Sequence, residues 1–140
     1  MDVSGLDIKI LKREAIAYWN LDPRNRPVKI TSINRDPMFW AEGYVTCYKF
    51  VGGRSLPEVE QILGLKVGEL SSGAFFHEFI DYPTADQFEL KGYSQCPGGE
   101  NWTPDSEYPR GLGAAQWQVK KNSFVASRVA AIVNPKGKLP

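Results

Sequence analysis

The chain has 140 residues, 42% of them hydrophobic, with 4 Trp, 6 Tyr and 7 Phe. This length and composition predict one small packed domain and exclude a disordered chain. The net charge of +1 disfavours nucleic acid as a partner, and no apolar run approaches the roughly 18 residues of a membrane span. The lack of such a run predicts a soluble domain that does not bind membranes, and the start of the chain lacks the basic and apolar regions of a signal peptide.

Four elements are expected in the first half of the chain. Apolar residues at three- and four-residue spacing predict an amphipathic helix over 7–19, and a loop with two prolines covers 20–27. A short strand is predicted over 28–33. A longer strand over 43–51 is predicted from its aromatic and β-branched residues.

A short helix over 57–63 has a signal at each end. Ser55 and Glu58 match a capping box, Pro57 lies in the first turn and Gly64 ends the helix. Residues 65–72 are expected to form a loop or half-turn. The apolar run 73–80 is ambiguous between strand and helix, and we favour a strand.

The last part of the chain is expected to be mostly strand. Alternation predicts a strand over 87–92, and residues 93–113 read as a long loop of the functional or mobile kind. A glycine-marked turn then leads into a short strand from Gln116, a polar hinge at 120–123 and a second apolar strand ending at Val133. Gln116 and Gln118 alternate with Trp117, so both glutamines should project from one face.

Together these elements predict an α+β fold. We expect a small single domain over 1–140, with an N-terminal helix and loop over 1–27. The rest, 28–140, is expected to be mostly a β core with one short helix near 57–63. Its sheet of short strands is expected to be mixed or antiparallel.

Several residues have the chemical types needed in a site, and each also has an ordinary structural interpretation. His77 is an acid–base candidate or a hydrogen-bonded histidine of the core. Arg54, after two glycines, is a phosphate clamp or an exposed arginine. Ser71 and Ser72 are pocket residues or loop serines. Trp117 is a stacking platform or a core aromatic residue.

The two cysteines and the single histidine restrict the chemistry further. Cys47 lies in an apolar run and Cys96 precedes Pro97, so the pair forms one disulfide or none. Neither cysteine has the CxxC spacing or the nearby histidine of a zinc site. No metal is therefore expected.

Three segments carry a resemblance to a known family: the run 48–53 (Tyr-Lys-Phe-Val-Gly-Gly), the Ser71-Ser72 step and the Gln-x-Gln strand. In this order they resemble the ADP-ribosyltransferase-like toxin domains at the C-termini of bacterial polymorphic toxins. They also resemble related NAD-consuming toxins with a glycine-rich turn before a Gln-aromatic pair. The transferases carry an arginine on their first strand where this chain has Lys49, and a catalytic glutamate where it has Gln118.

The resemblance implies NAD as the substrate and assigns roles residue by residue. Lys49 or Arg54 would hold the NAD phosphates, and Ser71 and Ser72 would support the nicotinamide ribose pocket. Gln116 or Gln118 would face the ribose, and Trp117 would form the wall beside nicotinamide. The implied setting is the cytoplasm of a target cell. A cognate immunity protein and a macromolecular acceptor of ADP-ribose are the implied partners.

Three alternatives stay open at the level of sequence. In the first, a carboxylate of the long loop, Glu100 or Glu107, would hydrogen-bond the ribose hydroxyls in place of a glutamine. A metal-independent ribonuclease toxin would use His77 and Glu78 with a nearby lysine or arginine. A non-enzymatic interaction module would use the aromatic residues as a surface patch.

Overall fold

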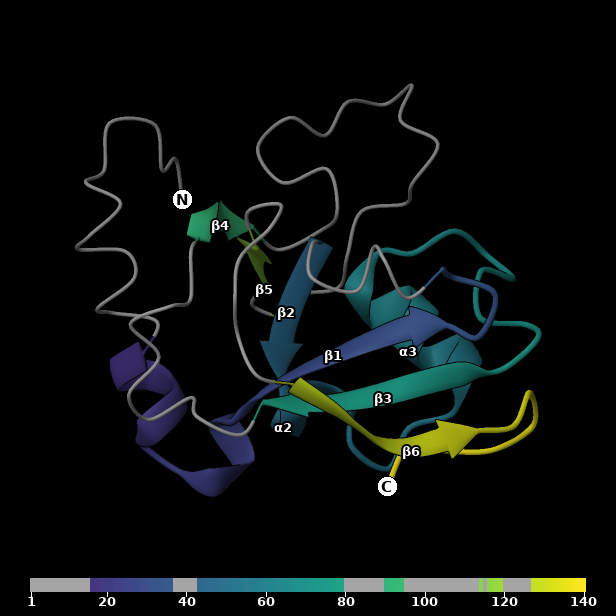
Figure 1. Ribbon diagram of the computed structural model, residues 1–140, viewed down its shortest axis with the longest axis horizontal. Helices are drawn as coiled ribbons and strands as arrows, with labels where there is room; N and C mark the ends of the chain where they lie inside the picture. Colours follow the sequence, from purple (N-terminus) through teal and green to yellow (C-terminus); the bar gives the residue numbers. More distant parts are fainter. Residues whose placement is uncertain (1–15, 37–42, 80–89, 95–113, 115, 120–126) are drawn as a thin grey trace.

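The computed structural model describes residues 16–36, 43–79, 90–94, 114, 116–119 and 127–140. These residues form an α+β fold, which confirms the predicted class. An antiparallel sheet carries short helices against one face (Figure 1). Among the described helices, none is long and apolar enough to cross a membrane.

Within the described residues the sheet has six strands in the order β4-β5-β2-β1-β3-β6, and every neighbouring pair is antiparallel. The antiparallel alternative of the sequence prediction is therefore the one found. The strands are β1 (Pro27–Ser32), β2 (Gly43–Cys47), β3 (Ala74–Phe79), β4 (Leu90–Ser94), β5 (Gln116–Val119) and β6 (Ser127–Val133).

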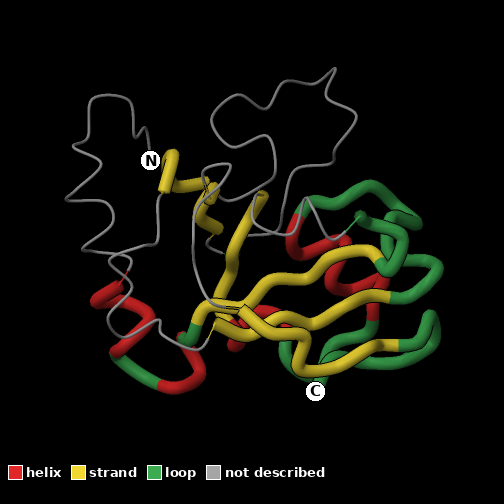
Figure 2. Tube along the Cα trace, viewed as in Figure 1, coloured by secondary structure: helices red, strands yellow, loops and turns green. Residues whose placement is uncertain are grey.

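The two central strands meet only at one end, and this place is called the β1–β2 junction below. Pro27 pairs with Cys47 and Val28 pairs with Thr46, whereas β1 pairs with β3 at five positions. Beyond the junction β2 turns away from β1 (Figures 1 and 2). The sheet therefore has two halves, β4-β5-β2 and β1-β3-β6, joined at the junction.

The helices are short, and local signals explain their ends. Residues 16–20 are helical, and η1 (Pro23–Asn25) and α2 (Tyr48–Val51) follow. In α3 (Leu56–Leu63) the predicted capping box is present, with Ser55 and Glu58 bonded reciprocally. Gly64 ends α3 at φ 72°, a left-handed conformation that costs glycine little because it has no Cβ.

The core lies between α2, α3 and the helix-facing side of the sheet. Burial of these side chains removes apolar surface from water and holds the helices on the sheet. Its buried members are Val28, Val51, Leu56, Val59, Leu63, Leu70, Ala74, Phe76, Ala114, Val133 and Leu139.

The segment after β6 returns to the helices. The Leu139 N–H donates to the Arg54 carbonyl at 2.9 Å, and the Gly53 N–H donates to the Leu139 carbonyl at 3.1 Å. Tyr48 Oη donates to the Pro140 carbonyl at 2.9 Å. Residues 138–140 are therefore tied to the connection between α2 and α3.

Some predicted boundaries are wrong. The strand expected over 43–51 ends at Cys47, and the rest of that segment is α2. The Tyr48 ring packs edge-on against Phe76 of the core and lies under the Arg26 guanidinium. These tertiary contacts outweigh the β propensity of the segment. Tyr93 belongs to β4 and not to the long loop.

Other expectations fall partly outside the described residues. The strands expected over 28–33 and 73–80 are confirmed as β1 and β3, and the turn over 65–72 is confirmed as well. The helix expected over 7–19 is described only from residue 16. The loop from 95 to 113 and the hinge at 120–123 lie outside the described part of the chain.

Candidate functional site

Gln116 is the candidate that the structure fixes most firmly. It is the first residue of β5 and pairs with Thr46 at the β1–β2 junction. The Gln116 side chain is 1% exposed. Its Nε2 donates to the Leu63 carbonyl at 3.0 Å, at the last residue of α3. A buried amide held in this way has one defined orientation, as a residue that positions a ligand requires.

Ser71 and Ser72 lie in the turn that follows α3, and both are exposed. This turn is held against the helix by Glu60, whose carboxylate accepts from the Gly68 N–H at 3.0 Å and the Leu70 N–H at 2.7 Å. Leu70 is buried in the same core cluster as Leu63. The two serines are therefore kept near the half of α3 that Gln116 contacts.

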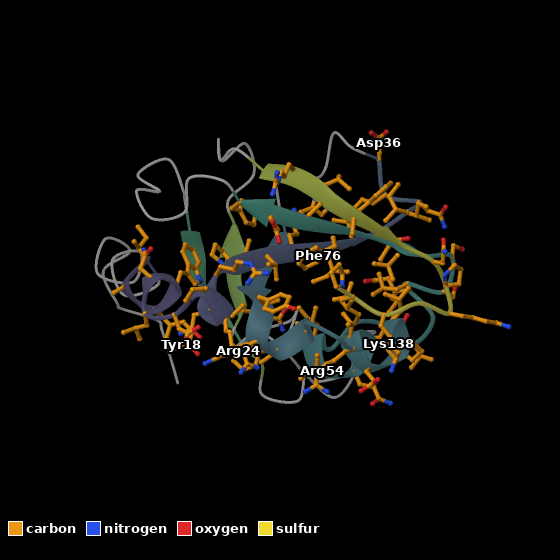
Figure 3. All side chains as sticks on the ribbon, turned by 90° about the horizontal axis from the view of Figure 1, so that it is seen from below. Tyr18, Arg24, Asp36, Arg54, Phe76 and Lys138 are labelled. Carbon is orange, nitrogen blue, oxygen red and sulfur yellow. The ribbon has the colours of Figure 1, made fainter. Side chains whose placement is uncertain are left out.

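Arg54 lies at the opposite end of α3, directly before the capping residue Ser55. Its Nε donates to the Phe50 carbonyl at 2.7 Å, and its Nη1 lies 3.6 Å from the carboxylate of Glu58. The guanidinium is partly exposed and has further N–H groups for an anion. Figure 3 shows Arg54 and Lys138 along the same side of the molecule, below Phe76.

The neighbouring carboxylate is held in its charged form. Hydrogen bonds from the side chain and backbone of Ser55 lower the pKa of Glu58, and the charges of Arg54 and Lys138 add to this effect. The Glu58 side chain is exposed, so water screens its attraction to Arg54. A phosphate at Arg54 would thus compete with only a weak ion pair.

Lys49 is not placed beside Arg54 as a second phosphate ligand. It lies on α2, with its Nζ 4.8 Å from the centre of the Tyr18 ring and 5.2 Å from that of Phe50. Both separations are in the range of cation–π contacts. Lys49 was expected on a strand, so the structure corrects its position.

His77 is buried on the face of the sheet turned away from α3. It is 1% exposed, and its Nε2 lies 2.8 Å from Thr31 Oγ1. Burial, together with the charge of Lys29, lowers the pKa of His77 to about 4. The imidazole is therefore neutral at pH 7, and the buried-histidine interpretation fits its surroundings.

Glu78 lies on the opposite face of β3, because successive strand residues alternate. Its carboxylate is 3.6 Å from Arg26 Nη2 and 3.4 Å from Arg128 Nη2. His77 and Glu78 thus have separate partners on separate faces. The acid–base pair expected for a ribonuclease is not brought together.

Lys29 is a buried charged residue that the sequence interpretation missed. It is 6% exposed and is the cross-strand partner of His77 on β1. Its position in the alternating run 27–32 was the only signal, since lysines on strands are usually exposed. As the cross-strand partner of His77, Lys29 lies on the same face of the sheet, turned away from α3.

The remaining candidates are only partly described. Trp117 and Gln118 belong to β5, but their side chains lie outside the described set, as do Glu100, Glu107 and Cys96. Cys47 is a free, buried thiol, and burial raises its pKa to about 12. Within the described residues, no cluster of three or more His, Cys, Asp or Glu side chains could hold a metal ion.

Comparisons with known proteins give no relative for this chain. No family model matches it, and neither the curated proteins nor the solved structures contain a significant match.

Proposed function

We propose that the protein is a toxin-like effector that consumes NAD, by hydrolysis or by transfer of ADP-ribose to an acceptor. The observation that carries the proposal is the arrangement of three kinds of candidate residue around one helix. Arg54 precedes α3, Gln116 is bonded to its last carbonyl, and the Ser71–Ser72 turn is held by Glu60 of the same helix.

The dimensions of α3 suit this role. Eight residues of α-helix span about 12 Å, so a ligand lying along α3 would contact both of its ends. Arg54 supplies a guanidinium for phosphate oxygens, and the glutamine amide supplies a hydrogen-bond acceptor for ribose hydroxyls. Lys29, the cross-strand partner of His77, lies on the face of the sheet turned away from α3 and is not part of this arrangement.

The chemistry assigned to these residues is cleavage of the bond between nicotinamide and ribose. As in glycoside hydrolysis, positive charge develops on the sugar as this bond breaks. A fixed acceptor at the ribose hydroxyls stabilises that charge without having to reorganise. Water as the nucleophile would give hydrolysis, and a nucleophilic side chain of a macromolecule would give ADP-ribosyl transfer.

The proposal is tested by incubating the purified protein with NAD and measuring nicotinamide release, with and without cell lysate. Release in buffer indicates a hydrolase, and release only with lysate indicates transfer to a macromolecule. Arg54→Ala should reduce release, whereas Arg24→Ala, which removes an exposed arginine of η1, should not. No release under either condition would overturn the proposal and favour an interaction module.

The biological setting follows from the same proposal. An NAD-consuming toxin would act in the cytoplasm of a target cell, and the producing cell would need an immunity protein. Expression of the chain in bacterial cytoplasm should lower the NAD pool and arrest growth. Arg54→Ala should relieve both effects at equal expression, and an unchanged NAD pool in arrested cells would contradict the assignment.

A further inference from the structure

The end of α3 satisfies its carbonyl groups in two different ways. Those of Glu60 and Gln61 accept from the backbone N–H groups of Leu65 and Gly64. The carbonyl of Leu63 instead accepts from Gln116, a side chain 53 residues further along the chain. Helix C-termini carry the negative end of the helix dipole and leave carbonyl groups without intrahelical partners. A hydrogen-bond donor is therefore the favoured group at this position.

We infer that the Leu63 carbonyl selects an uncharged amide at position 116 and orients its oxygen as the acceptor for the nicotinamide ribose. The inference rests on the NAD-consuming function proposed above. Because Nε2 is bound to the carbonyl, Oε1 lies on the other branch of the same planar amide and is turned away from the helix end. The Leu63 carbonyl acts through Gln116 and is thus a positioning group.

A carboxylate cannot replace this amide in its charged form. A glutamate at position 116 would put a negatively charged oxygen beside a carbonyl oxygen, at the negative end of a helix and with 1% exposure. Both burial and this neighbour favour its protonated form, so its folded-state pKa would be raised. Once protonated, the acid has an O–H donor for Leu63 and keeps a carbonyl oxygen as an acceptor. Gln116→Glu should therefore resemble the wild type only at low pH.

The first test measures stability and does not depend on NAD. Because the pKa at position 116 is raised on folding, stability relative to the wild type falls as pH rises above the unfolded value. The urea midpoints of Gln116→Glu and the wild type should be similar at about pH 4.5. At pH 7.5 the midpoint of Gln116→Glu should be clearly lower than that of the wild type. The relative unfolding constant should rise by up to about tenfold per pH unit between the two pKa values.

Two further variants make the result specific. Gln61→Glu adds the same charge on the exposed side of the last turn of α3, and it should show a much smaller pH-dependent shift. Gln116→Met removes the donor without adding a titrating group, so its midpoint should fall equally at both pH values. Three results would each overturn the selection of the amide by Leu63. The urea midpoint of Gln116→Glu would be shifted equally at both pH values, or Gln61→Glu would show the same pH dependence as Gln116→Glu. In the third, Gln116→Met would unfold at the wild-type midpoint.

The second test concerns the substrate. At pH 7.5 the folded Gln116→Glu protein should release nicotinamide about tenfold more slowly than the wild type or slower still, and the ratio should recover towards pH 4.5. A ratio that does not change with pH would overturn the role at the ribose. If the wild type released no nicotinamide, the NAD function itself would fail, while the urea measurements would still decide the selection of the amide.

Discussion

The buried histidine makes the stability of this protein depend on pH. Unfolded, His77 has its ordinary pKa of 6.5, and in the folded protein burial and the charge of Lys29 lower this pKa to about 4. The unfolded state therefore binds more protons between these values, and stability is lost as pH falls. The loss between pH 7 and pH 5, where most carboxylates stay charged, should be about 2 kcal/mol.

Two measurements test this prediction directly. His77 is the only histidine in the chain, so an NMR titration of its imidazole gives the folded pKa without an assignment problem. Urea unfolding at pH 5, 6 and 7 gives the stability. His77→Gln keeps a polar side chain for Thr31 but does not titrate, so it should lose most of the dependence. An imidazole that titrates near 6.5, or a His77→Gln protein with the wild-type dependence, would refute the reasoning.

Three further predictions concern local structure. Ser55→Ala removes the capping box of α3 and should lower the free energy of unfolding by about 1 kcal/mol, measured in urea. Gly73 has φ +111°, and an added Cβ would lie 2.9 Å from a β6 carbonyl; Gly73→Ala should cost about 2 kcal/mol. Gly53→Ala, at φ +73° in open space, should cost less, and equal costs would show that the contact is unimportant. In a Cys96→Ser protein, Cys47 is the only thiol and should react with a thiol reagent at pH 8 only after denaturation, so fast native reaction would contradict its burial.

The sequence predicted most of the local structure, because the signals for it are short-range. The capping box at Ser55 and the glycine at 64 predicted α3, and short apolar or alternating runs predicted β1 and β6. The run that forms β3 was ambiguous between strand and helix, and the strand that we favoured is the one found. The failure at 43–51 has a long-range cause. The chain turns from β2 into α2 at Tyr48, whose ring packs against Phe76 and Arg26. No local sequence pattern indicates these long-range contacts.

The candidate site was harder to predict than the fold. The resemblance named Arg54, Gln116 and the two serines, but only the structure shows that α3 relates them. Lys29 was missed because a lysine in a short strand is normally exposed, and its burial depends on how the strands pair. The acid–base pair predicted from His77 and Glu78 is not formed, because adjacent residues of a strand point to opposite faces of the sheet.

The ties between residues 138–140 and the α2–α3 connection bear on how the chain acquires its structure during synthesis. Leu139 contributes to the core around α3, although more than seventy residues separate it from the helix. A chain that lacks residues 138–140 loses these hydrogen bonds and the Leu139 side chain from the core. Such long-range closure slows folding and leaves apolar surface exposed in the meantime. Acquisition of the compact state should thus follow completion of this segment, and released chains that end before residue 138 should be more sensitive to proteases than the 140-residue chain.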